Sequence, residues 1–304
     1  MLVTRLIIGT SMVGLTLLVL CLDEWLAPWY PLWFAFSAVV MGAAALELVG
    51  LMGETSARPS GNTVFGGVLA LVVANWVPHL VDRLYPHGGP SGHPPHDPSA
   101  PVSVLAWPLL TFVAVVMAAF IVQGVQFRKP GATLATIAGT VLAVAYIGLL
   151  AGFIVQFRWF DGPYHGLVPL VYLIATSKGA DTGAYTLGRI AGRHKLWPRL
   201  SPNKTIEGAF GGLLFGTGAA LIVEAIVRYG LHSVALGWGS AAAFGLVVGS
   251  AAQLGDLMES MIKRDCLRKD ASDAVPGFGG VLDVLDSLLF AGPVAYVYWL
   301  WLGP

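Results

Sequence analysis

The sequence predicts an all-α protein that crosses the membrane about nine times. The chain is 56% hydrophobic and only 11% charged, with a mean hydropathy of +0.73, whereas soluble domains carry about 25% charged residues. Its apolar residues gather in long runs, and a helix needs about 20 of them to cross the hydrocarbon core. Helices satisfy every backbone amide within one segment, and the runs lack the alternation of barrel strands.

Nine apolar segments qualify as spans. In chain order they are 6–22, 30–51, 63–81, 102–124, 133–156, 164–180, 208–228, 236–257 and 280–301. The second contains Glu47, and the sixth is short. We therefore expect an N-terminal region of about five spans over 1–160. A C-terminal region over 161–304 would hold the functional site and two charged loops, 178–207 and 256–280.

Glycine spacing within two of these segments predicts close helix packing. Gly212 and Gly216, and likewise Gly245 and Gly249, have the GxxxG spacing that lets helix backbones approach one another.

The Lys and Arg residues are distributed unevenly between the two sides of the membrane. Fourteen of the 17 lie at the N-terminus or in the loops after the even-numbered segments. By the positive-inside rule, the N-terminus lies in the cytoplasm, the C-terminus outside, and both charged loops face the cytoplasm. We expect a multi-pass protein of the cell (inner) membrane. The net charge is zero, so bulk charge indicates no partner, and we expect no nucleic acid.

Acidic residues mark the ends of the last two spans. Asp256 and Glu259 close one span, Asp283 and Asp286 open the next, and a basic loop lies between them. A charged side chain in a membrane segment costs roughly 2.5–3.5 kcal/mol, so it is a functional-site candidate by default. A solvated helix end explains one or two such charges but not Asp256, which directly follows a run of small apolar residues. Carboxylates placed this way pair with cations, and hard oxygen ligands suit Mg²⁺.

Helical spacing puts several of these residues on shared faces. Asp256, Glu259, Ser260 and Lys263 follow one another at i, i+3, i+4 and i+7, so they line one side of a helix. Glycines precede the last span, where backbone N–H groups at a helix start could bind an anion.

The other charged loop carries a second phosphate-binding candidate. Lys204, with the hydroxyl groups of Ser201 and Thr205, lies just before an apolar segment, where a helix N-terminus favours phosphate. The spacing is not that of a Walker A motif. The need for positive charge on the cytoplasmic side explains the number of lysines and arginines in this loop. It does not explain why a lysine and two hydroxyl groups stand together at the start of an apolar segment.

The stretch from Ser260 to Asp286 resembles the signature of the phosphatidate cytidylyltransferase (CDP-diglyceride synthase) family. Ten positions match at the family's spacing: Ser260, Lys263, Arg264, Lys269, Asp270, Pro276, Gly279, Gly280, Asp283 and Asp286. The segments DTGAY from Asp181 and SPNKTIEG from Ser201 look like the family's other blocks. Three positions depart, because Phe278 replaces a usual His, Val284 a usual Arg and Asn203 a common Lys.

The resemblance implies transfer of CMP from CTP to phosphatidate, giving CDP-diacylglycerol and pyrophosphate. It implies that Asp256 and Asp283 hold Mg²⁺, and that Asp286 and Glu259 hold a second cation or orient the first. The cationic side chains would stabilise pyrophosphate or the lipid headgroup: Lys204, Lys263, Arg264 and Lys269. The remaining substrate contacts would come from Asp181, Ser201, Thr205, Glu207, Ser260, Asp270, Gly279 and Gly280. The expected partners are CTP, phosphatidate and the bilayer, with self-association as a homodimer.

Three other readings stay open at this point. A cytidylyltransferase for an isoprenoid or ether-lipid phosphate would carry the same motif. A degenerate relative would follow from Phe278 and Val284. A transporter is the rival from another class, because intramembrane carboxylates also mark ion pathways. Against it, the charges gather at span ends and no inverted repeat is evident.

Overall fold

The structure is a computed structural model that describes residues 2–84, 103–160, 166–232, 236–275, 277 and 279–303. Pro276 and Phe278 therefore lie outside the described residues, so the family departure at Phe278 has no structural account. The chain forms two compact units, residues 1–155 with 270–282, and residues 156–269 with 283–304. The segment 270–282, expected within the C-terminal region, thus groups with the N-terminal helices.

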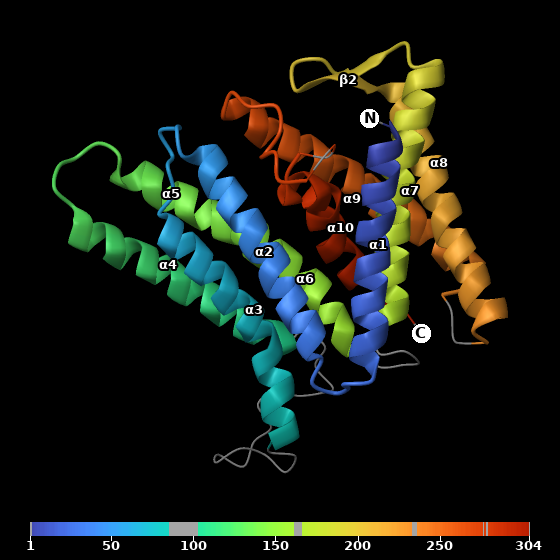
Figure 1. Cartoon of the computed structure of the whole chain (residues 1–304), viewed down its shortest axis with the longest axis horizontal. Coiled ribbons are helices and arrows are strands. Elements are labelled where there is room, and N and C mark those ends of the chain that lie inside the picture. The colour runs from blue at the N-terminus through green and yellow to red at the C-terminus, as the bar shows by residue number, and fades with distance from the viewer. Residues whose placement is uncertain are drawn as a thin grey trace. The chain divides into compact units, whose positions relative to one another are not determined.

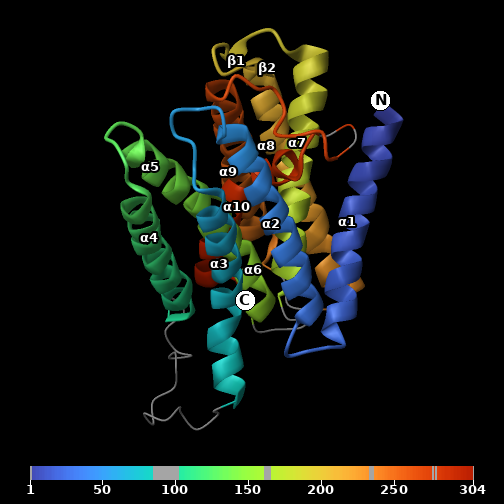
Figure 2. The same ribbon diagram turned by 60° about the vertical axis from the view of Figure 1, so that its left-hand side comes forward.

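The first unit is a set of helices in which each from α1 to α5 packs against the next along the chain. They are α1 (Leu2–Glu24), α2 (Pro31–Met52), α3 (Gly61–Leu84), α4 (Ala106–Gln126), α5 (Thr133–Ala143) and α6 (Leu150–Gln156). A 3₁₀ turn, Ser103–Leu105, precedes α4, and a π-helical segment, Val144–Leu149, joins α5 to α6. Figure 1 and Figure 2 show these helices in blue and green.

The start of α2 shows how local chemistry sets a helix boundary in this unit. Pro31 stands at the first helical position, where its missing N–H costs nothing. The buried Asp23 carboxylate accepts hydrogen bonds from the N–H groups of Leu32 (2.8 Å) and Trp33 (3.1 Å). Two N–H groups that a helix start leaves unpaired are thereby satisfied.

The second unit contains four long helices and a β-hairpin. They are α7 (Leu167–Ala191), the strands β1 (Lys195–Trp197) and β2 (Ser201–Thr205), α8 (Ile206–Ala225), α9 (Trp238–Asp265) and α10 (Val281–Leu302). A 3₁₀ turn, Phe157–Trp159, precedes α7, and a π-helical segment, Ile226–Gly230, extends α8. Figure 1 and Figure 2 both show α7 and α8 side by side with the hairpin at one end of the pair.

Glycines allow α7, α8 and α9 to pack backbone against backbone. A Cβ at Gly183 of α7 would lie 2.3 Å from the carbonyl oxygen of Gly211, and a Cβ at Gly245 of α9 would lie 2.5 Å from the Cα of Thr217. The predicted GxxxG packing is confirmed at Gly212 and Gly216, where an added Cβ would lie 3.0 and 3.2 Å from carbonyl oxygens of α7. These contacts fix the helices that carry the acidic residues.

The predicted all-α membrane architecture is confirmed. Each of the nine predicted segments coincides with a helix of the described residues. Seven of these are long and apolar enough to cross a membrane: Pro31–Met52, Gly61–Val81, Ala106–Gln126, Thr133–Trp159, Ile206–Gly230, Trp238–Asp265 and Val281–Leu302. The helices α1 and α7 are not among the seven, so the count of nine crossings stays a prediction.

The expected loop 178–207 is wrong over its first half. Helix α7 continues to Ala191 instead of ending near 180, and residues 195–205 form the hairpin. The hydroxyl groups of Thr182 and Thr186 are accommodated within the helix, since each donates to the carbonyl oxygen four residues earlier at 2.7 Å. Likewise the first part of 256–280 belongs to α9, which ends at Asp265.

Candidate active site

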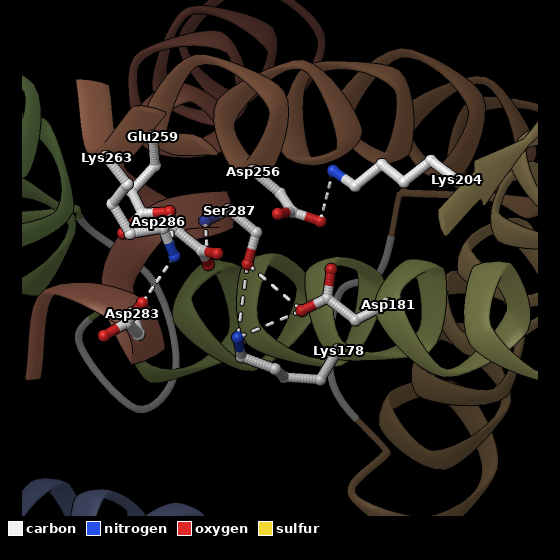
Figure 3. Close-up of polar contacts among 9 residues, drawn as sticks. All are labelled: Lys178, Asp181, Lys204, Asp256, Glu259, Lys263, Asp283, Asp286 and Ser287. Carbon is white, nitrogen blue, oxygen red and sulfur yellow. Dashed lines mark hydrogen bonds and ion pairs between the residues drawn. The ribbon is translucent and has the colours of Figure 1, made fainter. Parts of the chain in front are cut away.

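Acidic side chains from α7, α9 and α10 meet in the second unit. Figure 3 shows Asp181 on α7, Asp256 and Glu259 on α9, and Asp283 and Asp286 on α10. The backbones of α9 and α10 are in near contact beside them, since a Cβ at Gly255 would lie 2.6 Å from the carbonyl oxygen of Asp286. The five carboxylates divide into two clusters.

The first, here called the aspartate cluster, consists of Asp181, Asp256 and Asp286 with Lys178 and Ser287. The ammonium group of Lys178 donates to the Asp181 Oδ2 (3.1 Å) and to the Ser287 Oγ (3.2 Å). It also donates to the carbonyl oxygen of Val284 at 3.1 Å, and Ser287 Oγ donates to the Asp181 Oδ2 at 3.2 Å. One lysine therefore ties α7 to α10 and supplies a positive charge among carboxylates.

Asp286 and Asp256 complete this cluster. The Asp286 Oδ1 accepts the N–H of Ser287 at 2.5 Å, and its carboxylate interacts electrostatically with Asp256, Lys178 and Asp181. Asp256 forms an ion pair with Lys204, 2.6 Å from Nζ to Oδ2, and the two side chains stay 34% and 25% exposed. A substrate phosphate could therefore reach this lysine and this carboxylate.

The second, here called the Lys263 cluster, consists of Glu259, Lys263 and Asp283. The Lys263 Nζ lies 2.6 Å from the Glu259 Oε2 and 2.5 Å from the Asp283 Oδ1. The exposed fractions of the side chains are 12% for Lys263, 1% for Glu259 and 7% for Asp283. Breaking a buried pair by removing one partner costs roughly 3–5 kcal/mol, because a buried charge is left alone. Both carboxylates of this cluster are therefore held by the lysine.

Lys204 lies on the hairpin and pairs with Asp256. Residues that follow Lys204 in the chain hold the hairpin in place. Thr205 caps α8, since its Oγ1 accepts the N–H of Gly208 at 3.1 Å. The Glu207 carboxylate accepts the N–H groups of Arg193 (3.0 Å) and His194 (3.2 Å) and lies 2.6 Å from the His194 Nδ1. In this structure Thr205 and Glu207 thus hold the chain in place around Lys204.

Backbone N–H groups just before and at the start of α10 are engaged within the first unit, among them that of the predicted Gly279. The Gly279 N–H donates to the carbonyl oxygen of Val275 at 3.0 Å, and the N–H groups of Val281 and Leu282 donate to the Glu47 carboxylate at 3.0 and 2.8 Å. A carboxylate of the chain itself therefore occupies the start of α10, where the sequence had suggested phosphate.

The other predicted residues belong to neither cluster. Arg264 and Lys269 are exposed, and the Arg264 Nη1 donates to the carbonyl oxygen of Arg268 at 3.0 Å. Asp270 is exposed and belongs to the first unit. Ser260 is buried and Ser201 half-buried. No structural finding assigns these five residues a substrate contact.

Two members of the aspartate cluster were missed from the sequence. From the sequence alone, Lys178 is explained as one of the positive charges that orient the chain, and Ser287 has no feature that singles it out. The usable signal was the spacing, because Lys178 precedes Asp181 by one helical turn inside an otherwise apolar stretch. Burial and the neighbouring Asp265 raise the pKa of the Cys266 thiol.

The donor chemistry of the aspartate cluster suits Mg²⁺. Among the residues that the structure describes, no three His, Cys, Asp or Glu side chains form a ready metal-binding group. Mg²⁺, however, commonly takes one or two carboxylates and completes its shell with water and substrate phosphates. The half-exposed carboxylate of Asp256, with Asp181 and Asp286 nearby, meets that requirement.

The known proteins that this chain resembles are cytidylyltransferases. The model described as "Cytidylyltransferase family" matches residues 98–302. The chain is 36% identical to the phosphatidate cytidylyltransferase of Bacillus subtilis over 155 residues, 51% of this chain and 55% of that protein. It is 38% identical to that of Staphylococcus epidermidis over 153 residues, 50% of this chain and 55% of that protein.

A third relative extends the similarity over most of the chain. The phosphatidate cytidylyltransferase of Synechocystis is 28% identical over 306 aligned positions, which cover 87% of this chain and 91% of that protein. The matches to the Bacillus and Staphylococcus proteins span only about half of their length. The helices that carry both clusters lie within the matched residues 98–302.

Proposed function

Because the chain belongs to the cytidylyltransferase family, as the stretch from Ser260 to Asp286 predicted, we propose that it transfers CMP from CTP to phosphatidate. The products are CDP-diacylglycerol and pyrophosphate. One observation carries the proposal beyond family membership: carboxylates from three helices and two lysines, Lys178 and Lys204, converge within the matched region. Charged side chains within membrane segments are costly and mark functional sites by default, and this group is suited to charged substrates.

The reaction requires charge control more than proton transfer. A phosphate oxygen of the lipid attacks the α-phosphorus of CTP, the new P–O bond forms, and the bond from that phosphorus to the β-phosphate oxygen breaks. The lipid phosphate is already anionic near neutral pH, so no strong base is needed. The chief barrier is repulsion between two anions, which positive groups lower.

The lysines of the site are placed to lower this repulsion. Lys204, half-buried and held by Asp256, can turn its ammonium group to a bound phosphate without leaving the hairpin. The exposed Arg264 in the last turn of α9 and the exposed Lys269 in the loop that follows can bind pyrophosphate or the lipid headgroup. Lys263 is committed to Glu259 and Asp283, so its role is to position those carboxylates.

We propose Asp256 and Asp286, with Asp181, as the residues that would hold Mg²⁺, which when bound would neutralise phosphate charge and polarise the α-phosphorus. The assignment from sequence was Asp256 with Asp283, supported by Asp286 and Glu259. The present assignment leaves out Asp283 and Glu259 because both pair with Lys263. Asp256 is a ligand in both assignments. Substitutions of Asp181 and Asp283 therefore distinguish the two.

The primary test uses purified protein in detergent, CTP and phosphatidate, with and without Mg²⁺. We expect CDP-diacylglycerol that depends on Mg²⁺. CTP binding without product would contradict phosphatidate as substrate and favour another lipid phosphate or an inactive relative. Absence of both CTP binding and product would favour the transporter reading.

A first prediction concerns the metal ligands. Asp256→Asn should lower the rate at least about 100-fold, because the shared ligand and the partner of Lys204 are lost together. Asp181→Asn should raise the Mg²⁺ concentration needed for half-maximal rate, whereas Asp283→Asn should lower the rate at saturating Mg²⁺ through the freed Lys263. The control is Asp273→Asn, an exposed carboxylate, which should leave both quantities unchanged. The reverse pattern for Asp181 and Asp283 would restore the assignment made from sequence.

We further propose that the site faces the cytoplasm, where CTP is available, that the membrane is the cell (inner) membrane, and that the protein self-associates as a homodimer. The charge distribution supports the orientation. Light scattering of the detergent-solubilised protein would measure the oligomeric state.

A further inference from the structure

Glu47 is the acidic residue of α2, and its carboxylate contacts the loop that joins α9 to α10. The Glu47 Oε1 accepts hydrogen bonds from the Ser272 hydroxyl (2.7 Å) and the Val281 N–H (3.0 Å). Its Oε2 accepts the Leu282 N–H at 2.8 Å. Residues 270–282 belong to the same compact unit as α2, so these bonds lie within one unit.

The loop is shaped to admit this carboxylate. A Cβ at Gly280 would lie 2.4 Å from the Glu47 Oε2 and 2.8 Å from its Oε1, so a larger residue there would displace the side chain. The Val275 N–H and carbonyl oxygen exchange hydrogen bonds with Gly279, which closes the loop just before the contact. The Ser272 hydroxyl also accepts the N–H of Ala274 at 3.1 Å. Both ends of the loop are thus tied to one carboxylate.

The contact sets where α10 begins. Val281 and Leu282 are the first residues of α10, and their N–H groups have no partner within the helix. An anion at a helix N-terminus stabilises that start through hydrogen bonds and through the helix dipole. Asp283, the residue that pairs with Lys263, follows directly. The register of the first turn therefore decides where this carboxylate is placed.

We propose that Glu47 is a positioning residue for the reaction, which fixes the loop 270–282 and the first turn of α10 so that Asp283 meets Lys263. The activity part of this inference rests on the proposed function, whereas the contact itself can be tested without substrate.

The substrate-free test is hydrogen–deuterium exchange of the wild type and of Glu47→Gln in detergent. The amide of glutamine cannot accept both N–H groups as the two carboxylate oxygens do, so peptides covering 270–285 should exchange faster. The control is Glu54→Gln, an exposed glutamate just after α2, which should leave these peptides unchanged. Equal exchange in the wild type and Glu47→Gln would overturn the proposal.

The activity test separates positioning from loss of folded protein. A misplacement of about 1 Å that arises from a change remote from the chemistry can cost roughly 100-fold, so we expect Glu47→Gln to lower kcat about 10- to 100-fold with a small change in the KM for CTP. Gly280→Ala should give a similar loss, because its Cβ would collide with Glu47. Glu47→Asp, which is one methylene shorter, should then restore part of the activity of Gly280→Ala.

Two negative results of the activity test lead to different conclusions. If Glu47→Asp does not improve Gly280→Ala, the steric coupling between the two residues is refuted. If the wild type shows no transfer at all, the proposed function fails, and the exchange measurement alone still decides whether Glu47 holds the loop.

Discussion

Lysine ammonium groups hold most of the acidic residues of this site. Lys178 contacts Asp181, Lys204 contacts Asp256, and Lys263 contacts both Glu259 and Asp283. Paired charges in an apolar setting cost less than single ones, so the lysines make the carboxylates tolerable there. The same pairs keep three ammonium groups among the carboxylates of the site.

Replacing Lys178 tests the aspartate cluster at the residue scale. Lys178→Met keeps the apolar stem but removes the group shared by Asp181, Ser287 and the carbonyl of Val284. We expect the rate of CMP transfer to fall by at least about tenfold, with Lys178→Arg intermediate. The exposed Lys195→Met is the control. Wild-type rates in Lys178→Met, measured on equal amounts of folded protein, would remove Lys178 from the site.

Some residues of this site could be predicted from the sequence and others could not. Asp256 and Asp286 were identifiable because a carboxylate beside an apolar run demands an explanation. Lys178 was not, because a lysine near a span end is already explained by orientation. Glu47 was visible as an anomaly, but its partners, Val281 and Leu282, lie 234 and 235 residues away in the chain. Spacing rules cannot identify a contact over that distance.

At the scale of elements, α7 places its polar face by packing closely on α8. Gly183 meets the backbone of Gly211, and Gly179 lies near the carbonyl oxygen of Phe215. Helix association in a membrane depends on such close approach because lipid chains supply little hydrophobic drive. Asp181 lies between these two glycines, so its position depends on this contact.

A glycine pair on these helices allows a matched test of packing. Gly183→Ala adds a Cβ that would lie 2.3 Å from the carbonyl oxygen of Gly211, whereas Gly218→Ala on α8 meets nothing within 4 Å. We expect Gly183→Ala to lower the melting temperature in detergent and the transfer rate, and Gly218→Ala to preserve or raise stability, since alanine favours helix by about 1 kcal/mol. A neutral Gly183→Ala would show that α7 and α8 separate at no cost.

The elements differ in how far sequence predicts them. The apolar runs located every helix because length and hydropathy suffice for that. The end of α7 and the hairpin were not predicted, because the residues from Asp181 to Arg189 mix polar side chains with two glycines, which disfavour a helix. Their helical state follows from the close glycine contacts with α8, which depend on the tertiary structure.

At the scale of the whole molecule, the uneven distribution of Lys and Arg predicts a cytoplasmic loop after α9. Cys266 lies directly after this helix, and Cys21 is the only other cysteine in the sequence. In a Cys21→Ser background, a membrane-impermeant maleimide should label Cys266 only after the cells are permeabilised. The raised pKa of Cys266 keeps the thiol protonated at neutral pH, so labelling should accelerate as the pH rises toward 9. Labelling in intact cells would reverse the orientation.

The return of residues 270–282 to the N-terminal unit has a genetic consequence. Similarity to the Bacillus and Staphylococcus relatives covers about half of this chain, and such a pattern invites the view that the remainder is a replaceable anchor. If Glu47 holds the loop, a lesion in α2 would have the phenotype of a lesion more than 200 residues downstream. A second mutation in the loop 270–282 should then suppress a lesion in α2, and a second mutation in α2 should suppress a lesion in the loop. The two segments would therefore be expected to change together.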